Sequence, residues 1–525
     1  MTTPAVCILT AGAGSRMGTY GRLINKALLP LGNQAIISHI IDGFHAETDF
    51  VIALGHHGEQ VRAYLEAAHP SRHVEFVQVD RYEGPGSGPG YSLLCCQHRL
   101  HRPFYFVASD TLFVPATDPG TGRNWAGVAR VPLDRSASYC NLRVKDGRVT
   151  AILDKQRAGD DYLAFTGFLH VSDHELFWRS LSDDSAVGAE HQVSNGLAGL
   201  VEAGMLDAVE GTWRDVGDYD KYRNVQAAAP GFDFGKTDEF IYFPGERVVK
   251  FFRDPAIVAG RARKAALKAD VFPRLETVSE QFYSYRRAPG DTLYAKNSRA
   301  TFNRLLRWLE SDVWTRVQVD PARMRALCTR FYREKTTERL EAFNRKYPDY
   351  VAPESVNGES VMPVRELLDR LPWDRLVDGI AAFIHGDLQF DNILHDEDTG
   401  RFLLLDWRQD FAGEVDFGDL YYDLAKLYGG LTLNYDYIKS GLFCVRRAGR
   451  DLTVDFAVHS LHETLRADFE QFVENRGFDL SRIRLLLGLI FLNMSPLHHE
   501  PFDLALYSLG SRVLTREVLE ACTHL

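Results

Sequence analysis

Leu9-Thr10-Ala11-Gly12-Ala13-Gly14-Ser15-Arg16-Met17 is a glycine-containing loop that directly follows a short apolar run, Val6 to Leu9. Such a run leading into glycines is typical of a buried strand followed by a phosphate-binding loop, whose backbone amides can point at an anion. A dinucleotide-binding fingerprint would need a third glycine at the position of Met17. Two cations, Arg16 and Lys26, are found instead. They suit a triphosphate whose pyrophosphate leaves with growing negative charge.

Short apolar runs alternate with helical patterns through the first part of the chain. Isoleucine pairs at 36–37 and 40–41 repeat at helical spacing and predict a crossover helix between the first two strands. This alternation predicts a parallel α/β sheet with a Rossmann-like arrangement. The predicted strands are 6–9, 50–54, 74–79 and 104–108.

A second cluster of polar residues stands far along the chain, in His385-Gly386-Asp387-Leu388-Gln389-Phe390-Asp391-Asn392 and the later pair Asp406-Trp407. Asp387 can accept the proton of an attacking hydroxyl, while Asn392 and Asp406 can hold the magnesium that bridges nucleotide phosphates. These residue types at this spacing predict a phosphoryl-transfer site. We interpret His385 as a support for the loop.

The segment between the two motifs changes character twice. Ala227-Ala228-Ala229-Pro230-Gly231 is small, uncharged and rich in helix breakers, so it predicts a hinge. A hairpin around Pro244-Gly245 and a strand at 283–286 then predict a small β lobe, and helical patterns dominate from about residue 298. The predicted domains are 1–228, 235–297 and 298–525.

Leu9 to Met17 together with Lys26-Ala27-Leu28-Leu29-Pro30 resembles the signature of the nucleoside-triphosphate transferase family. That family includes sugar-1-phosphate nucleotidyltransferases and bacterial phosphocholine cytidylyltransferases. The resemblance spans roughly residues 4 to 225. It implies an in-line attack by a substrate phosphate on the nucleotide α-phosphorus, with release of pyrophosphate and with catalytic roles for Arg16 and Lys26.

The same resemblance implies further site residues. Asp110, at the end of the fourth strand, and Asp215, within Trp213 to Gly217, correspond to metal-binding aspartates. A helix cap and a surface turn are the alternatives for these two residues. Lys155 resembles a lysine that contacts the acceptor phosphate, and the Gly84–Gly90 loop is expected to line the base pocket. The predicted nucleotide-binding residues of this domain are Ala11, Gly12, Gly14, Ser15, Gly88 and Gly90.

The second motif is similar to that of the choline kinase and aminoglycoside phosphotransferase family, relatives of protein kinases, over about residues 235 to 525. This resemblance implies a two-lobed α+β protein-kinase-like domain in which Lys250, on a predicted strand, binds nucleotide phosphates. His-Gly-Asp and Asp406-Trp407 replace the corresponding protein-kinase motifs and point to a small-molecule acceptor. No acidic residue follows Asp254 up to Ala269, which leaves the partner of Lys250 open.

Composition limits the classes of function. The net charge of -11 disfavours a nucleic-acid-binding role, because such proteins usually present a basic face. Seven scattered cysteines without metal-binding spacing are expected to be reduced thiols. No signal peptide is evident, and the apolar run Leu485–Leu492 is shorter than the ~20 residues that cross a bilayer. We therefore expect a cytoplasmic protein without membrane insertion.

Both resemblances together imply a bifunctional enzyme. The kinase would use ATP and magnesium to phosphorylate a small alcohol, with choline as the leading acceptor. The transferase, also with magnesium, would join the product to a nucleoside monophosphate, with CTP as the leading donor, for decoration of a surface glycan or lipid. The alternatives are a sugar kinase fused to a sugar-1-phosphate nucleotidyltransferase, and a transferase with a non-catalytic kinase-like binding module. A homo-oligomer is left open.

Overall fold

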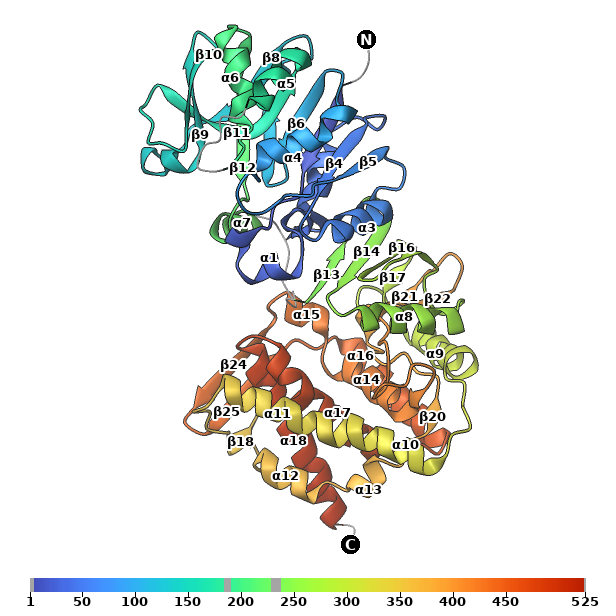
Figure 1. Cartoon of the computed structure of the whole chain (residues 1–525). Coiled ribbons are helices and arrows are strands. Elements are labelled where there is room, and N and C mark those ends of the chain that lie inside the picture. Colours follow the sequence, from blue (N-terminus) through green and yellow to red (C-terminus); the bar gives the residue numbers. More distant parts are fainter. Residues whose placement is uncertain (1–3, 184–189, 228–237, 524–525) are drawn as a thin grey trace. The chain divides into compact units, whose positions relative to one another are not determined.

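The computed structural model describes residues 4–183, 190–227 and 238–523 (Figure 1). The chain packs into two compact units. The first contains residues 1–254 and 276–285, and the second contains residues 255–275 and 286–525. Of the predicted hinge at 227–231, only Ala227 lies within the described residues. The three predicted domain boundaries stay predictions.

A ten-stranded sheet forms the centre of the first unit, with the strand order β5-β4-β1-β6-β11-β8-β12-β10-β9 and with β7 paired to β12. The four strands predicted from the sequence are confirmed, and they pair in parallel. Beyond β6 the sheet is mixed, because β11 runs antiparallel to both β6 and β8. The strands are β1 Ala5–Leu9, β4 Phe50–Leu54, β5 Val74–Gln78, β6 Phe104–Ala108, β7 Thr111–Pro115, β8 Asn124–Ala129, β9 Cys140–Lys145, β10 Arg148–Asp154, β11 Tyr162–Val171 and β12 Leu206–Asp215. A separate two-stranded ribbon pairs β2 Pro30–Leu31 with β3 Gln34–Ala35.

Helices cover both faces of this sheet. Val6 and Ile8 of β1 lie in a core with residues of α2 and α3, whereas Ala5 and Cys7 lie in a second core with residues of α4, α5 and α6. Successive strand residues face opposite sides, so burial on both faces explains the unbroken apolar run that the sequence shows. The helices are α1 Thr19–Leu23, α2 Ile36–Asp42, α3 Gly58–Ala68, α4 Pro89–Cys96, α5 His174–Ser182, α6 Ser194–Glu202 and α7 Tyr219–Ala227, with short turns η1 Ser15–Met17, η2 Lys26–Leu28, η3 Gln97–Arg99 and η4 Leu133–Ser138.

A small four-stranded sheet, ordered β13-β14-β16-β15, also packs largely within the first unit. Its strands are β13 Glu239–Tyr242, β14 Arg247–Phe252, β15 Leu275–Val278 and β16 Phe282–Arg286. The predicted hairpin is confirmed, because β13 and β14 are antiparallel. Tyr242 is fully buried, donates its hydroxyl hydrogen to the Leu28 carbonyl at 2.7 Å, and has its ring 4.9 Å from that of Tyr64. The small sheet therefore shares the core of the larger one.

The second unit is mainly helical, as expected from about residue 298. Its helices are α8 Pro255–Leu267, α9 Arg299–Trp308, α10 Pro321–Cys328, α11 Lys335–Lys346, α12 Val364–Arg370, α13 Trp373–Leu376, α14 Leu420–Thr432, α15 Tyr435–Lys439, α16 Ser460–Asn475, α17 Leu480–Met494 and α18 Phe502–Thr523, with wider turns η5 Leu309–Val313 and η6 Thr329–Glu334 and short turns η7 Phe390–Asn392 and η8 Ser495–Leu497. Its strands are β17 Asp291–Thr292, β18 Ser355–Val356, β19 Glu359–Ser360, β20 Ala381–Ala382, β21 Ile393–His395, β22 Phe402–Leu404, β23 Gly418–Asp419, β24 Phe443–Ala448 and β25 Asp451–Phe456. The kinase-like, two-lobed description of this half stays a prediction.

One stretch in the second unit, Leu480–Leu497, is long and apolar enough to cross a membrane by length and composition, and 61% of it is buried. The sequence-based expectation counted only the run Leu485–Leu492 and understated this stretch. Central helices of water-soluble proteins pass the same test when they are mostly buried. The six cysteines described are unpaired thiols.

We predict that Tyr242→Ala destabilises the first unit by about 3–5 kcal/mol, because it removes a fully buried ring and its hydrogen bond. The neighbouring Ile241→Ala is the matched control, since Ile241 is 41% exposed on the other face of the strand. Its effect should stay within about 0.5 kcal/mol. Urea unfolding of the full-length protein measures both values. Equal midpoints for the two variants would contradict the shared core.

Candidate functional site

The glycine loop lies between β1 and η1, as the sequence predicts. Gly14 has a φ of 63°, a left-handed conformation that favours glycine. A Cβ atom at Gly14 would lie 3.7 Å from the Cβ of Lys26, so the loop and this lysine are adjacent. Buried Asn25 fixes the arrangement by donating its amide hydrogens to the carbonyl oxygens of Thr10 at 2.8 Å and His56 at 2.7 Å.

Asp110 and Asp215 are brought together by strand pairing. Asp110 lies between β6 and β7, and its neighbour Thr111 pairs in register with Asp215 at the end of β12. A Cβ atom at Gly217 would lie 3.0 Å from Asp215 Oδ1 and 3.2 Å from Asp110 Oδ2. The two carboxylates therefore both lie close to Gly217.

Two lysines oppose these carboxylates. Lys26 Nζ lies 2.7 Å from Asp110 Oδ2, and Lys221 Nζ lies 2.7 Å from Asp215 Oδ2. Burial raises the pKa of Asp110, but the charges of Lys26 and Arg16 outweigh it and hold that pKa below its usual value. Both Lys26 and Arg16, predicted as catalytic residues, thus act on the Asp110 carboxylate.

Sequence reasoning missed Lys221 and Tyr139. Tyr139 donates its hydroxyl hydrogen to Asp215 Oδ2 at 2.8 Å. Burial opposes the charge of Lys221, but Asp215 outweighs this effect and raises the pKa of Lys221. Lys221 lies in the first turn of α7, just after the Asp215 segment. This closeness in the sequence could have identified it. Tyr139 lies 76 residues from Asp215 and gave no such signal.

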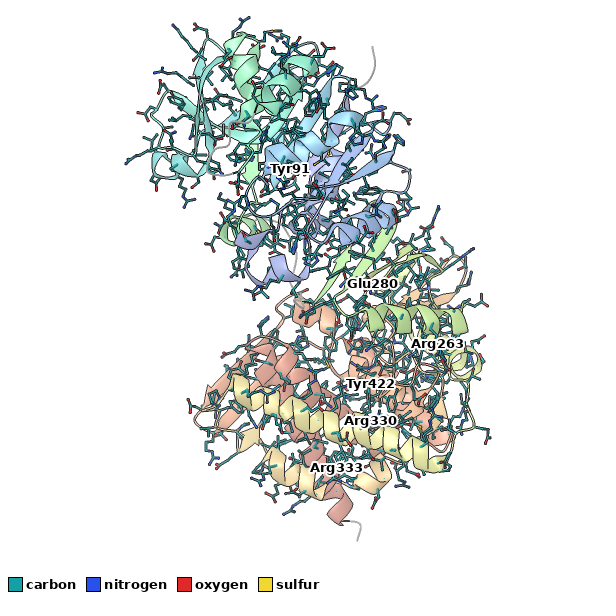
Figure 2. The ribbon with its side chains drawn as sticks, in the orientation of Figure 1. Tyr91, Arg263, Glu280, Arg330, Arg333 and Tyr422 are labelled. Atoms are coloured by element: carbon teal, nitrogen blue, oxygen red, sulfur yellow. The ribbon has the colours of Figure 1, made fainter. Side chains whose placement is uncertain are left out.

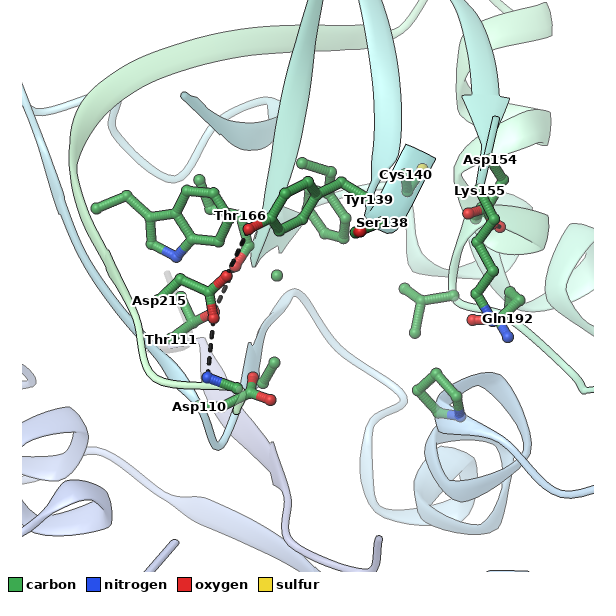
Figure 3. A pocket seen from close by; sticks show the side chains of 18 of the residues that line it. Asp110, Thr111, Ser138, Tyr139, Cys140, Asp154, Lys155, Thr166, Gln192 and Asp215 are labelled. Atoms are coloured by element: carbon green, nitrogen blue, oxygen red, sulfur yellow. Dashed lines mark hydrogen bonds between the residues drawn. The ribbon is translucent and has the colours of Figure 1, made fainter. Parts of the chain in front are cut away.

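A cavity of about 250 Å³ connects these groups with the predicted acceptor-binding residue (Figure 3). Arg16, Asp110 and Asp215 line it, as does Lys155. Figure 3 shows the two aspartates on one side and Lys155 with Asp154 on the opposite side. Lys155 Nζ lies 3.1 Å from Glu190 Oε2. Residues from four separate segments thus surround one space.

Gly88 and Gly90 have a packing role that the sequence did not reveal. A Cβ atom at Gly88, where φ is 127°, would lie 2.5 Å from the His191 carbonyl oxygen. At Gly90 it would lie 2.7 Å from the Gln192 carbonyl oxygen. Close approach of two backbones accounts for both glycines. Their contact with a nucleobase stays a prediction, although Pro89 between them lines the cavity.

The second predicted site lies in the second unit, around Asp387. Lys426 Nζ is 2.6 Å from Asp387 Oδ1, and the exposed fractions of the two side chains are 8% and 39%. Loss of hydration around Asp387 raises the pKa of its carboxyl group. The charge of Lys426 outweighs this effect and keeps that pKa below its usual value. Fully buried Asp423 holds the loop by accepting backbone hydrogen bonds from His385 and Gly386, each 2.7 Å long.

The segments that carry Asn392 and Asp406 are joined by a backbone hydrogen bond. The side-chain amide of Asn392 donates a hydrogen to the backbone carbonyl of Asp387 at 2.9 Å. The backbone carbonyl of Asn392 accepts from the Leu405 amide at 2.8 Å. Asp406 Oδ1 lies 3.1 Å from Arg261 Nη1. His385 is fully buried, and burial lowers its pKa to about 4, so it is neutral at pH 7.

Lys426 and Lys250 differ in whether the sequence predicted them as functional residues. Lys426 was missed; it lies three residues after buried Asp423 on α14. Lys250 lies on β14 with 4% exposure, and β14 belongs to the first unit. Its predicted role in binding nucleotide phosphates stays a prediction.

Comparisons with known proteins bear on the first unit. Residues 6–119 match the model of the MobA-like NTP transferase domain. The chain is similar to solved structures of UDP-glucose pyrophosphorylase: the apo form (15% identity, TM-score 0.38), the complex with UDP-glucose (17%, 0.38) and the protein from Acinetobacter baumanii (14%, 0.37). Each similarity covers 43% of this chain. It covers 98% of the apo and UDP-glucose-bound chains and 93% of the Acinetobacter baumanii chain. No curated protein matches significantly. The N-terminal part of this chain therefore contains a nucleotidyltransferase-type α/β domain.

Proposed function

We propose that the first unit transfers a nucleoside monophosphate from a nucleoside triphosphate, with CTP as the leading donor, onto a phosphorylated small molecule. An oxygen of the acceptor phosphate attacks the α-phosphorus, the bond from the α-phosphorus to the bridging oxygen breaks, and pyrophosphate leaves. The observation that carries this proposal is the single cavity lined by Arg16, Asp110, Lys155 and Asp215 beside the glycine loop. Arg16 and Lys26 stabilise the growing negative charge.

The residues around this cavity fit the magnesium ion that the resemblance implies. Asp110 and Asp215 both line the cavity, and a carboxylate oxygen of each lies close to Gly217. Within the described ranges no group of three or more His, Cys, Asp or Glu residues could hold a metal. Magnesium is commonly held by one or two carboxylates together with substrate phosphates, so two aspartates suffice. A bound ion would screen the two phosphate groups from each other.

We further propose that the second unit phosphorylates a small alcohol with ATP. The hydroxyl oxygen attacks the γ-phosphorus, its proton passes to Asp387, the bond from the γ-phosphorus to the bridging oxygen breaks, and ADP leaves. The accessible, anionic carboxylate of Asp387 supports this role. Asn392 and Asp406, whose side chains carry the oxygen ligands that magnesium prefers, would hold the ion that neutralises phosphate charge there.

The two reactions would be consecutive, because the phosphate that the kinase installs is the group that the transferase attacks with. A sugar kinase that feeds a sugar-1-phosphate nucleotidyltransferase remains the alternative with the same chemistry. Assays with CTP, GTP, UTP and dTTP and several phosphorylated acceptors separate the two. Failure of the second unit to turn over ATP with any of a broad panel of alcohols would favour a non-catalytic binding module.

We predict that Asp110→Asn and Asp215→Asn each lower pyrophosphate release by at least about a hundredfold, because each removes a carboxylate that would hold the magnesium ion that screens the phosphates. ATP-dependent phosphorylation of an alcohol should be unchanged. Asp161→Asn is the matched control, because Asp161 forms an exposed ion pair with Arg143 in the same unit. Undiminished pyrophosphate release from either active-site variant would remove that aspartate from the mechanism.

We predict that Asp387→Asn lowers phosphorylation of the alcohol by about 10²–10⁴-fold, because the variant cannot accept the hydroxyl proton. Nucleotidyl transfer onto a supplied phosphorylated acceptor should continue at the wild-type rate. Asp374→Asn, at a fully exposed position of the same unit, is the control. Loss of both activities in Asp387→Asn would contradict the assignment of one reaction to each unit.

We predict that Lys221→Met strengthens Mn²⁺ binding severalfold, because Lys221 competes with a metal ion for the Asp215 carboxylate. Titration calorimetry with Mn²⁺ on the full-length protein measures this change. Lys145→Met, an exposed lysine on β9, should leave the affinity unchanged. Weaker binding in Lys221→Met would show that the lysine supports the metal site instead.

A further inference from the structure

The carboxylates of the second site already have cationic partners. Three aspartates belong to its two motifs, and each lies next to a separate lysine or arginine. These ion pairs are Lys426–Asp387 at 2.6 Å, Lys439–Asp391 at 3.3 Å and Arg261–Asp406 at 3.1 Å. The negative charges of the two motifs are thereby balanced within the protein.

Three more cations gather at the same place without a carboxylate partner. Lys335 begins α11, and Arg339 follows one helical turn later on the same face. The Cβ of Arg408 lies 2.7 Å from the Cβ position of Gly386, so its side chain starts beside the loop that carries Asp387. Within residues 4–183, 190–227 and 238–523, none of these three cations forms an ion pair.

The three cations lie close enough to influence one another. Lys335 Nζ lies 4.1 Å, and the guanidinium carbon of Arg408 5.0 Å, from the centre of the Phe331 ring. Burial, with the charges of Arg408, Arg339 and Lys426, lowers the pKa of Lys335 to about 6. Burial and the charge of Arg408 lower the pKa of Arg339 as well. With a pKa of about 6, Lys335 is largely neutral at pH 7 in the free protein, and an anion bound beside it would favour its charged form.

Another group of arginines in this unit is arranged differently. The cavity between α14, α16, α17 and α18 is lined by four arginines, but three glutamates line it too. Arg484 lies 3.0 Å from Glu470, and Arg516 lies 2.8 Å from Glu359. The arginines of that surface are largely balanced by the protein itself. Arg339 and Arg408 near Asp387 form no ion pair in the described part of the chain, so they are available to an anionic ligand.

The aromatic cluster of Phe331, Phe411 and Tyr422 does not offer a cage for a quaternary ammonium group. Phe331 stacks on Phe411 with ring centres 4.1 Å apart, and Tyr422, labelled in Figure 2, packs edge-on at 4.9 Å. Lys335 and Arg408 already lie over the Phe331 ring. A cationic ligand would meet these charges and be repelled, whereas arginine and lysine together suit an oxyanion.

We propose that the acceptor alcohol of the second unit carries an oxyanion, a carboxylate, phosphonate or phosphate, which Lys335, Arg339 and Arg408 bind while its hydroxyl group faces Asp387. This inference rests on the proposed kinase function of the second unit. It replaces choline, the acceptor expected from the family resemblance, with an anionic hydroxy compound.

The first test compares acceptors of different charge with the full-length protein, ATP and Mg²⁺. ADP release is measured with glycerol, choline, glycerate, 2-hydroxyethylphosphonate and glycerol 3-phosphate. At least one anionic acceptor should exceed glycerol and choline in kcat/KM by about a hundredfold, since charged hydrogen bonds are each worth about tenfold or more. The three anions distinguish carboxylate, phosphonate and phosphate. A preference for choline or glycerol would overturn the proposal.

The second test assigns the effect to the cations. Lys335→Met and Arg339→Gln should each raise KM for the preferred anionic acceptor about tenfold or more, with KM for ATP unchanged. Arg512→Gln is the control, because Arg512 is another partly buried arginine of this unit and lines the charge-balanced cavity. Thermal unfolding and nucleotidyl transfer check that each variant is folded. A rise in KM for ATP alone would assign these cations to the nucleotide and overturn the proposal.

Direct binding separates failure of this inference from failure of the kinase function. Titration calorimetry with 2-hydroxyethylphosphonate, glycerate and glycerol 3-phosphate, without ATP, should show binding of at least one anion that the Lys335→Met/Arg339→Gln double variant loses. Such binding without ADP release from any alcohol would overturn the kinase function and retain the anion site. Phosphorylation of choline without binding of any of the three anions would retain the kinase function and overturn the anion site.

Discussion

The approach of two carboxylates, Asp110 and Asp215, is the constraint on which the first unit depends. Each carboxylate has a lysine partner, Lys26 for Asp110 and Lys221 for Asp215, at 2.7 Å each. The pairing of β7 with β12 sets the positions of the aspartates, and a carboxylate oxygen of each lies close to Gly217. The mixed half of the sheet therefore matters as much to this site as the parallel half that holds the glycine loop.

The second unit holds its carboxylates in a similar way. Lys426 forms an ion pair with Asp387, and buried Asp423 accepts hydrogen bonds from the backbone amides of His385 and Gly386. In both units a lysine thus keeps a reactive carboxylate charged before any substrate binds. The two sites differ in net charge. Positively charged side chains without a carboxylate partner lie near Asp387, where the acceptor hydroxyl is expected.

Local patterns predicted much of this structure. The apolar runs of β1, β4, β5 and β6, the isoleucine pairs of α2 and the hairpin at Pro244-Gly245 all form as expected, because each depends on burial or turn chemistry within a few residues. The antiparallel strand β11 was not foreseen, since pairing between distant strands leaves no local pattern. The same reason hid Tyr139 and the packing of Gly88 against His191. The small sheet was expected as a lobe of the second half, yet it shares its core with the first through Tyr242.

A crystal structure of the full-length protein with Mn²⁺ and a non-hydrolysable CTP analogue tests the central claim most directly. We expect anomalous manganese density between Asp110 and Asp215, with the α-phosphate on the same ion and the lysines moved from the carboxylates to phosphate oxygens. Bound nucleotide with both ion pairs intact and no manganese density between the aspartates would contradict it.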